Sequence, residues 1–102
     1  MGQIVELDVR PYLRQKLEPF KQIMNAVDSL EPNELFVLHA TFKPTPLLGF
    51  MKTKGYTHKV EEQAEDHWIA AFAKGKEAQV RLASLSLRAF AEHVEEAAVD
   101  EQ

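Results

Sequence analysis

Leu35-Phe36-Val37-Leu38-His39-Ala40 is the stretch that decides the fold, because it is nearly all apolar and prone to form β-structure. Such a run is typical of a strand that is covered on both faces or lies in the middle of a sheet. A compact turn, Glu31-Pro32-Asn33-Glu34, precedes it, and a stiff loop, Phe42-Lys43-Pro44-Thr45-Pro46, follows it. We therefore expect a central strand over residues 35–40.

Toward the N-terminus, residues 4–10 show the period of a second strand. Val5, Leu7 and Val9 alternate with charged residues, which predicts one buried and one polar face. Pro11 ends this strand because it lacks a backbone donor.

A helix is predicted between the two strands. Residues 11–17 show no period, but from Phe20 to Leu30 apolar side chains recur at spacings of three and four, which places them on one stripe of a helix. Pro19 is favourable in the first turn of this helix, and Glu18 lies beside the positive end of its dipole.

The segment after the central strand completes the order β-α-β-α-β-β. A short helix is expected over residues 47–54, with Gly55 supplying its left-handed stop. Residues 57–62 and 67–72 read as two strands, and the short connection 63–66 requires them to pair as an antiparallel hairpin. This order predicts an α/β (α+β) two-layer sandwich, with a mixed four-stranded sheet and two helices on one face.

The C-terminal part differs in composition. Residues 76–98 lack proline and glycine, and an apolar stripe running through Val80 and Phe90 predicts one long amphipathic helix. We therefore divide the chain into a domain at 1–74 and a C-terminal amphipathic helix with a frayed tail at 75–102. The additional helix either covers the helix-free sheet face of its own chain or packs in a homodimer; otherwise that face is exposed.

Composition limits the chemistry of the chain. Its 102 residues suffice for one domain, and the absence of cysteine excludes disulfides, thiolate metal sites and cysteine nucleophiles in this chain. A net charge of −4 argues against a nucleic-acid partner. No apolar run is long enough to cross a bilayer and Met1-Gly2-Gln3 does not begin a signal peptide, so we expect a cytoplasmic protein without a membrane partner.

Four short motifs carry a family resemblance. They are Leu7-Asp8-Val9-Arg10, Glu18-Pro19-Phe20, Phe42-Lys43-Pro44-Thr45-Pro46-Leu47 and Lys54-Gly55-Tyr56. In this order they resemble an uncharacterised bacterial and archaeal domain family related to the TusA/SirA sulfur carriers, over about residues 4–73. The resemblance implies a two-layer α/β sandwich.

The resemblance also points to a changed site. In the sulfur carriers a Cys-Pro-x-Pro motif begins the first helix, and the matching positions here are Lys16-Leu17-Glu18-Pro19. Because an amine cannot form a persulfide, we expect no sulfur relay by that mechanism.

Two loops are candidate binding sites. Arg10, Arg14 and Lys16, next to a helix N-terminus at Glu18 and Pro19, have the composition of an anion site or of a docking surface, although they also fit a solvated loop. Separately, Lys43 and Thr45 lie after the central strand, where open α/β sheets bind ligands. The alternative for the second loop is structural, with Thr45 capping the next helix.

Histidines do not suggest a metal. They are His39, His58, His67 and His93. None pairs at His-x-His or His-x-x-x-His spacing, so we expect neither metal nor other cofactor. A hairpin closed by Gln63 opposite Asp66 would place His58 across from Ala71, well away from His67.

These observations favour a non-catalytic TusA/SirA-like binding or adaptor module. It would recognise a partner protein or a small anionic ligand through the first-helix loop and the sheet face. The alternative is an enzyme or a sulfur-relay-related protein that uses Lys16, for which a nucleophilic lysine would need a buried environment.

Overall fold

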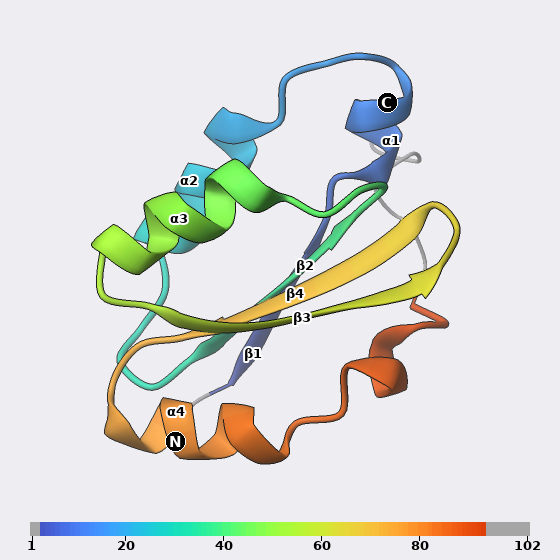
Figure 1. The fold of residues 1–102 in the computed structure, drawn as a ribbon. Helices are drawn as coiled ribbons and strands as arrows, with labels where there is room; N and C mark the ends of the chain where they lie inside the picture. Colours follow the sequence, from blue (N-terminus) through green and yellow to red (C-terminus); the bar gives the residue numbers. More distant parts are fainter. Residues whose placement is uncertain (1–2, 94–102) are drawn as a thin grey trace.

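The computed structural model describes residues 3–93, which form a four-stranded sheet between helices (Figure 1). The strands are β1 (Ile4–Asp8), β2 (Leu35–Ala40), β3 (Thr57–Ala64) and β4 (His67–Ala73). The helical segments are α1 (Arg10–Arg14), α2 (Phe20–Asp28), α3 (Thr45–Thr53), α4 (Lys76–Ser84) and the 3-10 turn η1 (Leu87–Phe90). The expected α+β fold with a mixed four-stranded sheet is confirmed.

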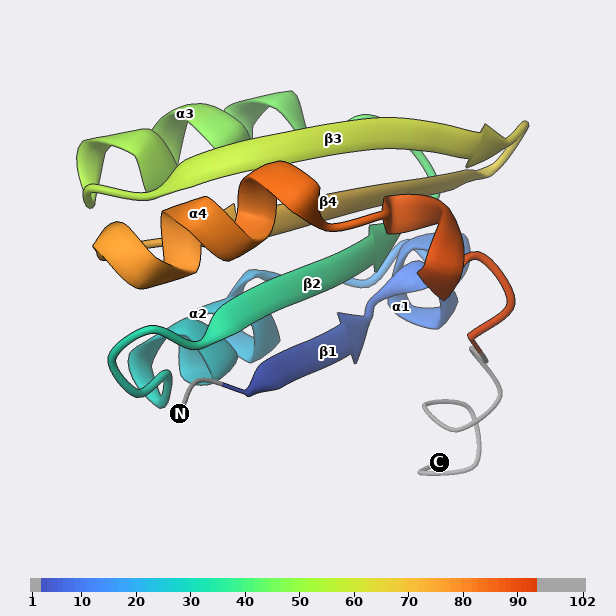
Figure 2. The ribbon, with the colours of Figure 1, turned by 90° about the horizontal axis from the view of Figure 1, so that it is seen from below.

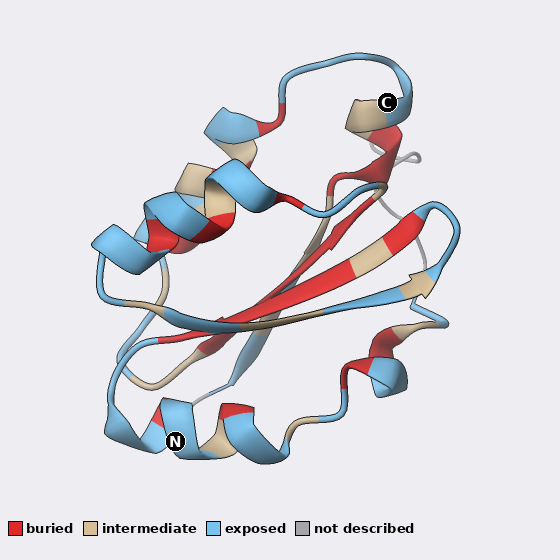
Figure 3. Cartoon of the chain, viewed as in Figure 1, coloured by how far each residue is buried: buried red, intermediate tan, exposed pale blue. Residues whose placement is uncertain are grey.

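The sheet has the strand order β1-β2-β4-β3. Strands β1 and β2 are parallel, whereas β4 pairs antiparallel with both β2 and β3. Every residue of β2 is buried, as its apolar run predicts for a central strand (Figure 3). β1 and β3 form the two edges and are more exposed.

One sheet face packs against α2 and α3. Phe36 and Phe72, from the two central strands, stack with ring centroids 5.9 Å apart. Ile23 and Val27 of α2 and Met51 of α3 are buried in the same cluster. The apolar stripe of the first predicted helix therefore reaches the core as expected.

The opposite sheet face is covered by α4 and η1, which lie in front of the sheet when the molecule is seen from below (Figure 2). Leu82 of α4 and Leu87 and Phe90 of η1 are buried against Val37 and Ile69 of the sheet. Of the three alternatives for this face, covering by the same chain is the one observed. The sheet face is consequently buried, and the expectation that it serves for recognition is wrong.

The long C-terminal helix is the largest departure from the sequence prediction. Helix α4 ends at Ser84, and Leu85 is extended with a ψ of 133°. Val80 of the expected buried stripe is 67% exposed, while Ala78 and Leu82 are buried instead. The break lets η1 reach the sheet, so tertiary contacts override the helical propensity of the segment. Residues 94–98 of the expected helix and the expected frayed tail lie outside the described residues.

The ammonium of one edge-strand lysine stabilises this break. Lys59 Nζ donates to the carbonyl oxygens of Leu82 at 3.0 Å, Ala83 at 3.2 Å and Leu85 at 2.6 Å. These carbonyls lie at the end of α4, where helical partners are missing and the helix dipole is negative. The lysine therefore acts as a C-terminal cap supplied by β3.

Helix α1 and the hairpin register also differ from expectation. Residues 10–14 form a short helix that starts with Arg10 and Pro11, a segment without a recognisable period. In the hairpin, His58 pairs with Phe72 rather than Ala71, and a β-bulge lies between Glu62 and Ala64. The extra residue of the bulge shifts the register, which turn composition alone does not reveal. No helix within residues 3–93 is long and apolar enough to span a bilayer.

Candidate functional site

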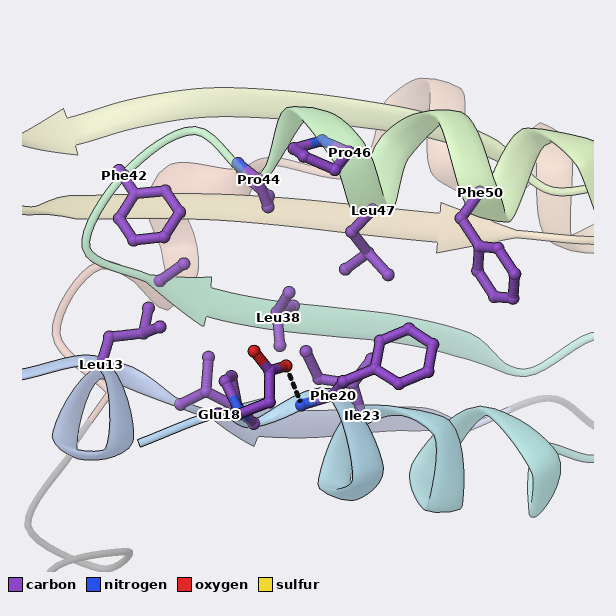
Figure 4. A pocket seen from close by; sticks show the side chains of 13 residues that line it. Leu13, Glu18, Phe20, Ile23, Leu38, Phe42, Pro44, Pro46, Leu47 and Phe50 are labelled. Atoms are coloured by element: carbon purple, nitrogen blue, oxygen red, sulfur yellow. Dashed lines mark hydrogen bonds between the residues drawn. The ribbon is translucent and has the colours of Figure 1, made fainter. Parts of the chain in front are cut away.

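An apolar groove opens between the starts of α2 and α3 (Figure 4). It has a volume of ≈ 420 Å³, and its floor includes Leu38 of β2. The residues that line it, twelve of them apolar, are Val9, Leu13, Glu18, Pro19, Phe20, Ile23, Leu38, Ala40, Phe42, Pro44, Pro46, Leu47 and Phe50. The groove thus lies at the carboxyl ends of β1 and β2, on the sheet face that α2 and α3 cover.

Three phenylalanines form its rim. Phe20 is 46% exposed, Phe42 is 53% exposed and Phe50 is 40% exposed. The rings of Phe20 and Phe50 meet edge to face with their centroids 5.7 Å apart, so the two helices hold each other's aromatic side chains in place. Leu17, which precedes the groove-lining Glu18, is also half-exposed. Together these side chains form an exposed apolar patch around the groove.

Glu18 is the one charged residue among the described side chains that line the groove. Its Oε2 accepts a hydrogen bond of 2.8 Å from the backbone N–H of Phe20, the first residue of α2. Pro19 is the N-cap of α2 and makes no side-chain capping bond. The carboxylate therefore occupies the positive end of the helix dipole, as the sequence predicts.

Two of the predicted cations are engaged elsewhere. Arg10 is buried, and its Nη2 lies 2.7 Å from Oδ2 of Asp8, while a further bond of 3.3 Å reaches the carbonyl oxygen of His93. Arg14 Nη2 lies 3.2 Å from Oδ2 of Asp66 in the β3–β4 connection. The structure does not bring Arg10 into an anion site with the other predicted cations.

Lys16 lies between two helices rather than at a helix start. It follows the C-terminal end of α1 with a φ of +61°, four positions before Phe20. Its backbone N–H donates to the carbonyl oxygen of Leu13, and the residue is exposed. Its side chain is thus presented to solvent beside the loop that leads to Glu18.

Lys43 and Thr45 lie in the loop between β2 and α3. Both are exposed, and Lys43 stands between two groove-lining residues, Phe42 and Pro44. The N-cap of α3 is Pro44 and no side chain caps it, so the expectation that Thr45 caps this helix is wrong. Pro46 lies in the first turn, where its fixed φ favours the helix start. This loop and the first-helix loop form opposite walls of the same groove.

A hydrogen-bonded histidine cluster lies on the other side of the sheet. His39 Nδ1 is 2.8 Å from His67 Nε2, and its Nε2 bonds the carboxylate of Glu6. His93 Nδ1 lies 2.7 Å from the same carboxylate. The Glu6 carboxylate thus bridges two imidazole rings, and the donor and acceptor roles within the cluster depend on the tautomers of the histidines.

This cluster escaped the sequence analysis because its members come from three strands and the C-terminal segment. Strand register brings Glu6, His39 and His67 together, because β1 pairs with β2 and β2 pairs with β4, and the C-terminal segment adds His93. Burial lowers the pKa of His67, and the charges of Arg10 and His39 lower it further, against the opposing effect of Asp8 and Asp66. Within residues 3–93, no group of three or more histidine or acidic side chains is arranged to hold a metal ion.

Fold and groove together define a small α+β domain whose central sheet is covered on both faces and whose helical layer carries an aromatic-rimmed groove. Residues 6–74 match a family described as uncharacterised conserved protein, DUF2249, and the chain belongs to this family. The matched region contains every residue that lines the groove. No curated protein and no solved structure matches the chain.

Proposed function

We propose that the chain is a non-catalytic binding or adaptor module that takes apolar side chains of a partner protein into the groove between α2 and α3. The gathering of Phe20, Phe42 and Phe50 around an apolar cavity is the observation that carries this proposal. Each ring leaves apolar surface in water, and burying that surface against a partner is favourable by about 25 cal/mol per Å².

The groove favours a partner protein over the small anionic ligand considered above. Among residues 3–93, none of the side chains that line it is cationic, and an anion inside it would lie close to the Glu18 carboxylate. Desolvating an anion without a cationic partner is strongly unfavourable. An apolar side chain, in contrast, would contact a groove whose lining includes twelve apolar residues.

The fold also supports a relationship to the TusA/SirA sulfur carriers, which we include in the proposal. Residues 4–73 follow the same order of strands and major helices, with α1 added between β1 and α2. Chemistry at Lys16 is less well supported, because this lysine is exposed and a nucleophilic amine needs a pKa lowered by burial or by neighbouring cations.

Selection from a random peptide library on the immobilised full chain tests the proposal. Selected peptides are then titrated by fluorescence anisotropy against Phe42→Ser and Phe50→Ser, and against Val80→Ser as the control. Val80 is equally apolar and still more exposed but lies on α4, under the other sheet face. Circular dichroism verifies that all three variants are folded.

Phe42→Ser should weaken binding about 60-fold, because roughly 100 Å² of the ring is available for burial. Val80→Ser should leave binding unchanged. Peptides whose binding is indifferent to both phenylalanines, or a selection that yields no peptide at all, would contradict the proposed function.

A further inference from the structure

The two stretches that line the groove have a charge opposite to that of the whole chain. The chain has 12 lysines and arginines against 16 aspartates and glutamates. Residues 9–23 and 38–54 nevertheless contain seven basic residues and a single acid, Glu18. The seven are Arg10, Arg14, Lys16, Lys21, Lys43, Lys52 and Lys54. The two stretches that carry the groove are therefore basic in an otherwise acidic protein.

Five of these residues, all lysines, are not neutralised by described acids. The two arginines pair with Asp8 and Asp66, but within residues 3–93 none of the lysines forms an ion pair. All five are exposed. Their charges are consequently available to a molecule that approaches from solvent.

Two of the lysines lie next to residues of the groove rim, one of them in space and the other in the sequence. Lys54 Nζ lies 5.7 Å from the centroid of the Phe50 ring, which places a cation over an aromatic wall. Lys43 stands between Phe42 and Pro44, both of which line the groove. Lys21 follows Phe20 in the same way at the start of α2. A lysine thus lies over the ring of Phe50, and a lysine follows Phe20 and Phe42 directly in the sequence.

We infer that the partner segment is acidic and amphipathic, with apolar side chains that enter the groove and carboxylates that face the rim lysines. This inference rests on the proposed function, since it specifies the partner of the same groove. Peripheral charges of this kind guide association and select partners, while apolar burial supplies most of the affinity. The Glu18 carboxylate inside the groove does not oppose an acidic segment of this kind. The apolar side chains of the segment enter the groove and approach Glu18, whereas its carboxylates stay outside at the rim.

Exposed phenylalanines among lysines also occur in proteins that bind single-stranded RNA, where bases stack on the rings. Here Phe20 and Phe50 meet edge to face, so each ring already contacts the other. A phosphate follows every stacked base, so the Glu18 carboxylate within the groove disfavours a strand whose bases enter it. A protein segment therefore fits the surface better than RNA does.

The test uses the peptides selected on the full chain, each synthesised a second time with every Asp and Glu replaced by its amide. Both forms are titrated by isothermal calorimetry against the wild-type chain and Lys43→Gln/Lys54→Gln. Lys76→Gln, which removes an exposed lysine from α4 outside the groove, serves as the control. The titrations are repeated at high salt, and oligouridine is added as a competitor.

The acidic form should bind about tenfold more tightly than its amide form at low salt, as expected for two or three rim ion pairs. High salt and Lys43→Gln/Lys54→Gln should each remove most of this difference, whereas Lys76→Gln should preserve it. Phe42→Ser should weaken both forms alike. Equal binding of the two forms, with Phe42 still required, would overturn the acidic partner but keep the proposed function. Displacement of the peptides by oligouridine would overturn the choice of a protein partner, and loss of the Phe42 requirement would overturn both.

Discussion

Replacing Lys59 by methionine should destabilise the protein by removing the cap of α4. The ammonium of Lys59 serves three carbonyl oxygens at 2.6–3.2 Å, all at or just beyond the end of that helix. A hydrogen bond to a charged group contributes about 1.5–3 kcal/mol net, and a cation at a helix C-terminus adds up to about 1 kcal/mol. Since one partly solvated ammonium shares its donors, we expect a total loss of about 2–3 kcal/mol.

For a domain of this size such a loss lowers the Tm by roughly 10–20 °C. Urea unfolding followed by circular dichroism measures the free energy of unfolding directly. Amide hydrogen exchange localises the effect, because Ala89 and Ala91 of the η1 region donate backbone hydrogen bonds that should open more often.

Two matched variants separate capping from a general effect of charge. Lys59→Arg keeps a cation near the carbonyl oxygens and should retain much of the stability. Lys76→Met removes a lysine from the first turn of α4, where a cation is unfavourable, and should be neutral or slightly stabilising. A change below about 0.5 kcal/mol for Lys59→Met would show that water replaces the ammonium and would refute the capping role.

Two further predictions concern the histidine cluster and the glycines. Because the pKa of His67 is lowered in the folded state, the unfolded chain gains the proton first, so stability is full above about pH 6.5 and falls as the pH drops below this value. Urea titrations at several pH values measure how the free energy of unfolding falls with pH. His67→Gln should make this fall smaller, whereas His58→Gln should not change it. An equal dependence on pH in the wild type and His67→Gln would contradict the assignment to His67. Gly49→Ala should stabilise α3 by about 0.5–1 kcal/mol, because nothing lies within 4 Å of the added methyl group. Gly75→Ala should destabilise by about 1–2 kcal/mol, since Gly75 has a φ of +99° and its Cβ would lie 2.9 Å from Asn33 Oδ1; thermal shifts of the same sign for the two would refute this reading.

Local periodicity was sufficient to predict the strands and α2. The alternation of Val5, Leu7 and Val9 places all three on the side of α2 and α3, because side chains of successive strand residues point to opposite faces. The end of α4 was not predictable in this way. It depends on Lys59, which is more than twenty residues away in the sequence, and on the burial of η1.

The candidate site was predicted only in part. Glu18 and Pro19 line the groove, but Arg10 is paired with Asp8, a residue of the same short motif. An ion pair between residues two apart depends on the turn from β1 into α1, which the aperiodic segment did not reveal. Phe42 offered a signal that the sequence analysis did not use. A large aromatic residue in a loop rich in proline has few ways to become buried within its own domain.

The two sides of the sheet differ in their relation to the family. Every groove-lining residue falls within the matched residues 6–74, whereas α4 and η1 follow them. In this chain the C-terminal segment buries Val37 and Ile69, so the side of the sheet away from the groove is occupied by the chain itself. On the side of α2 and α3, Phe20, Phe42 and Phe50 remain in contact with solvent. Because intramolecular packing accounts for one surface and not for the other, a partner is sought at the groove.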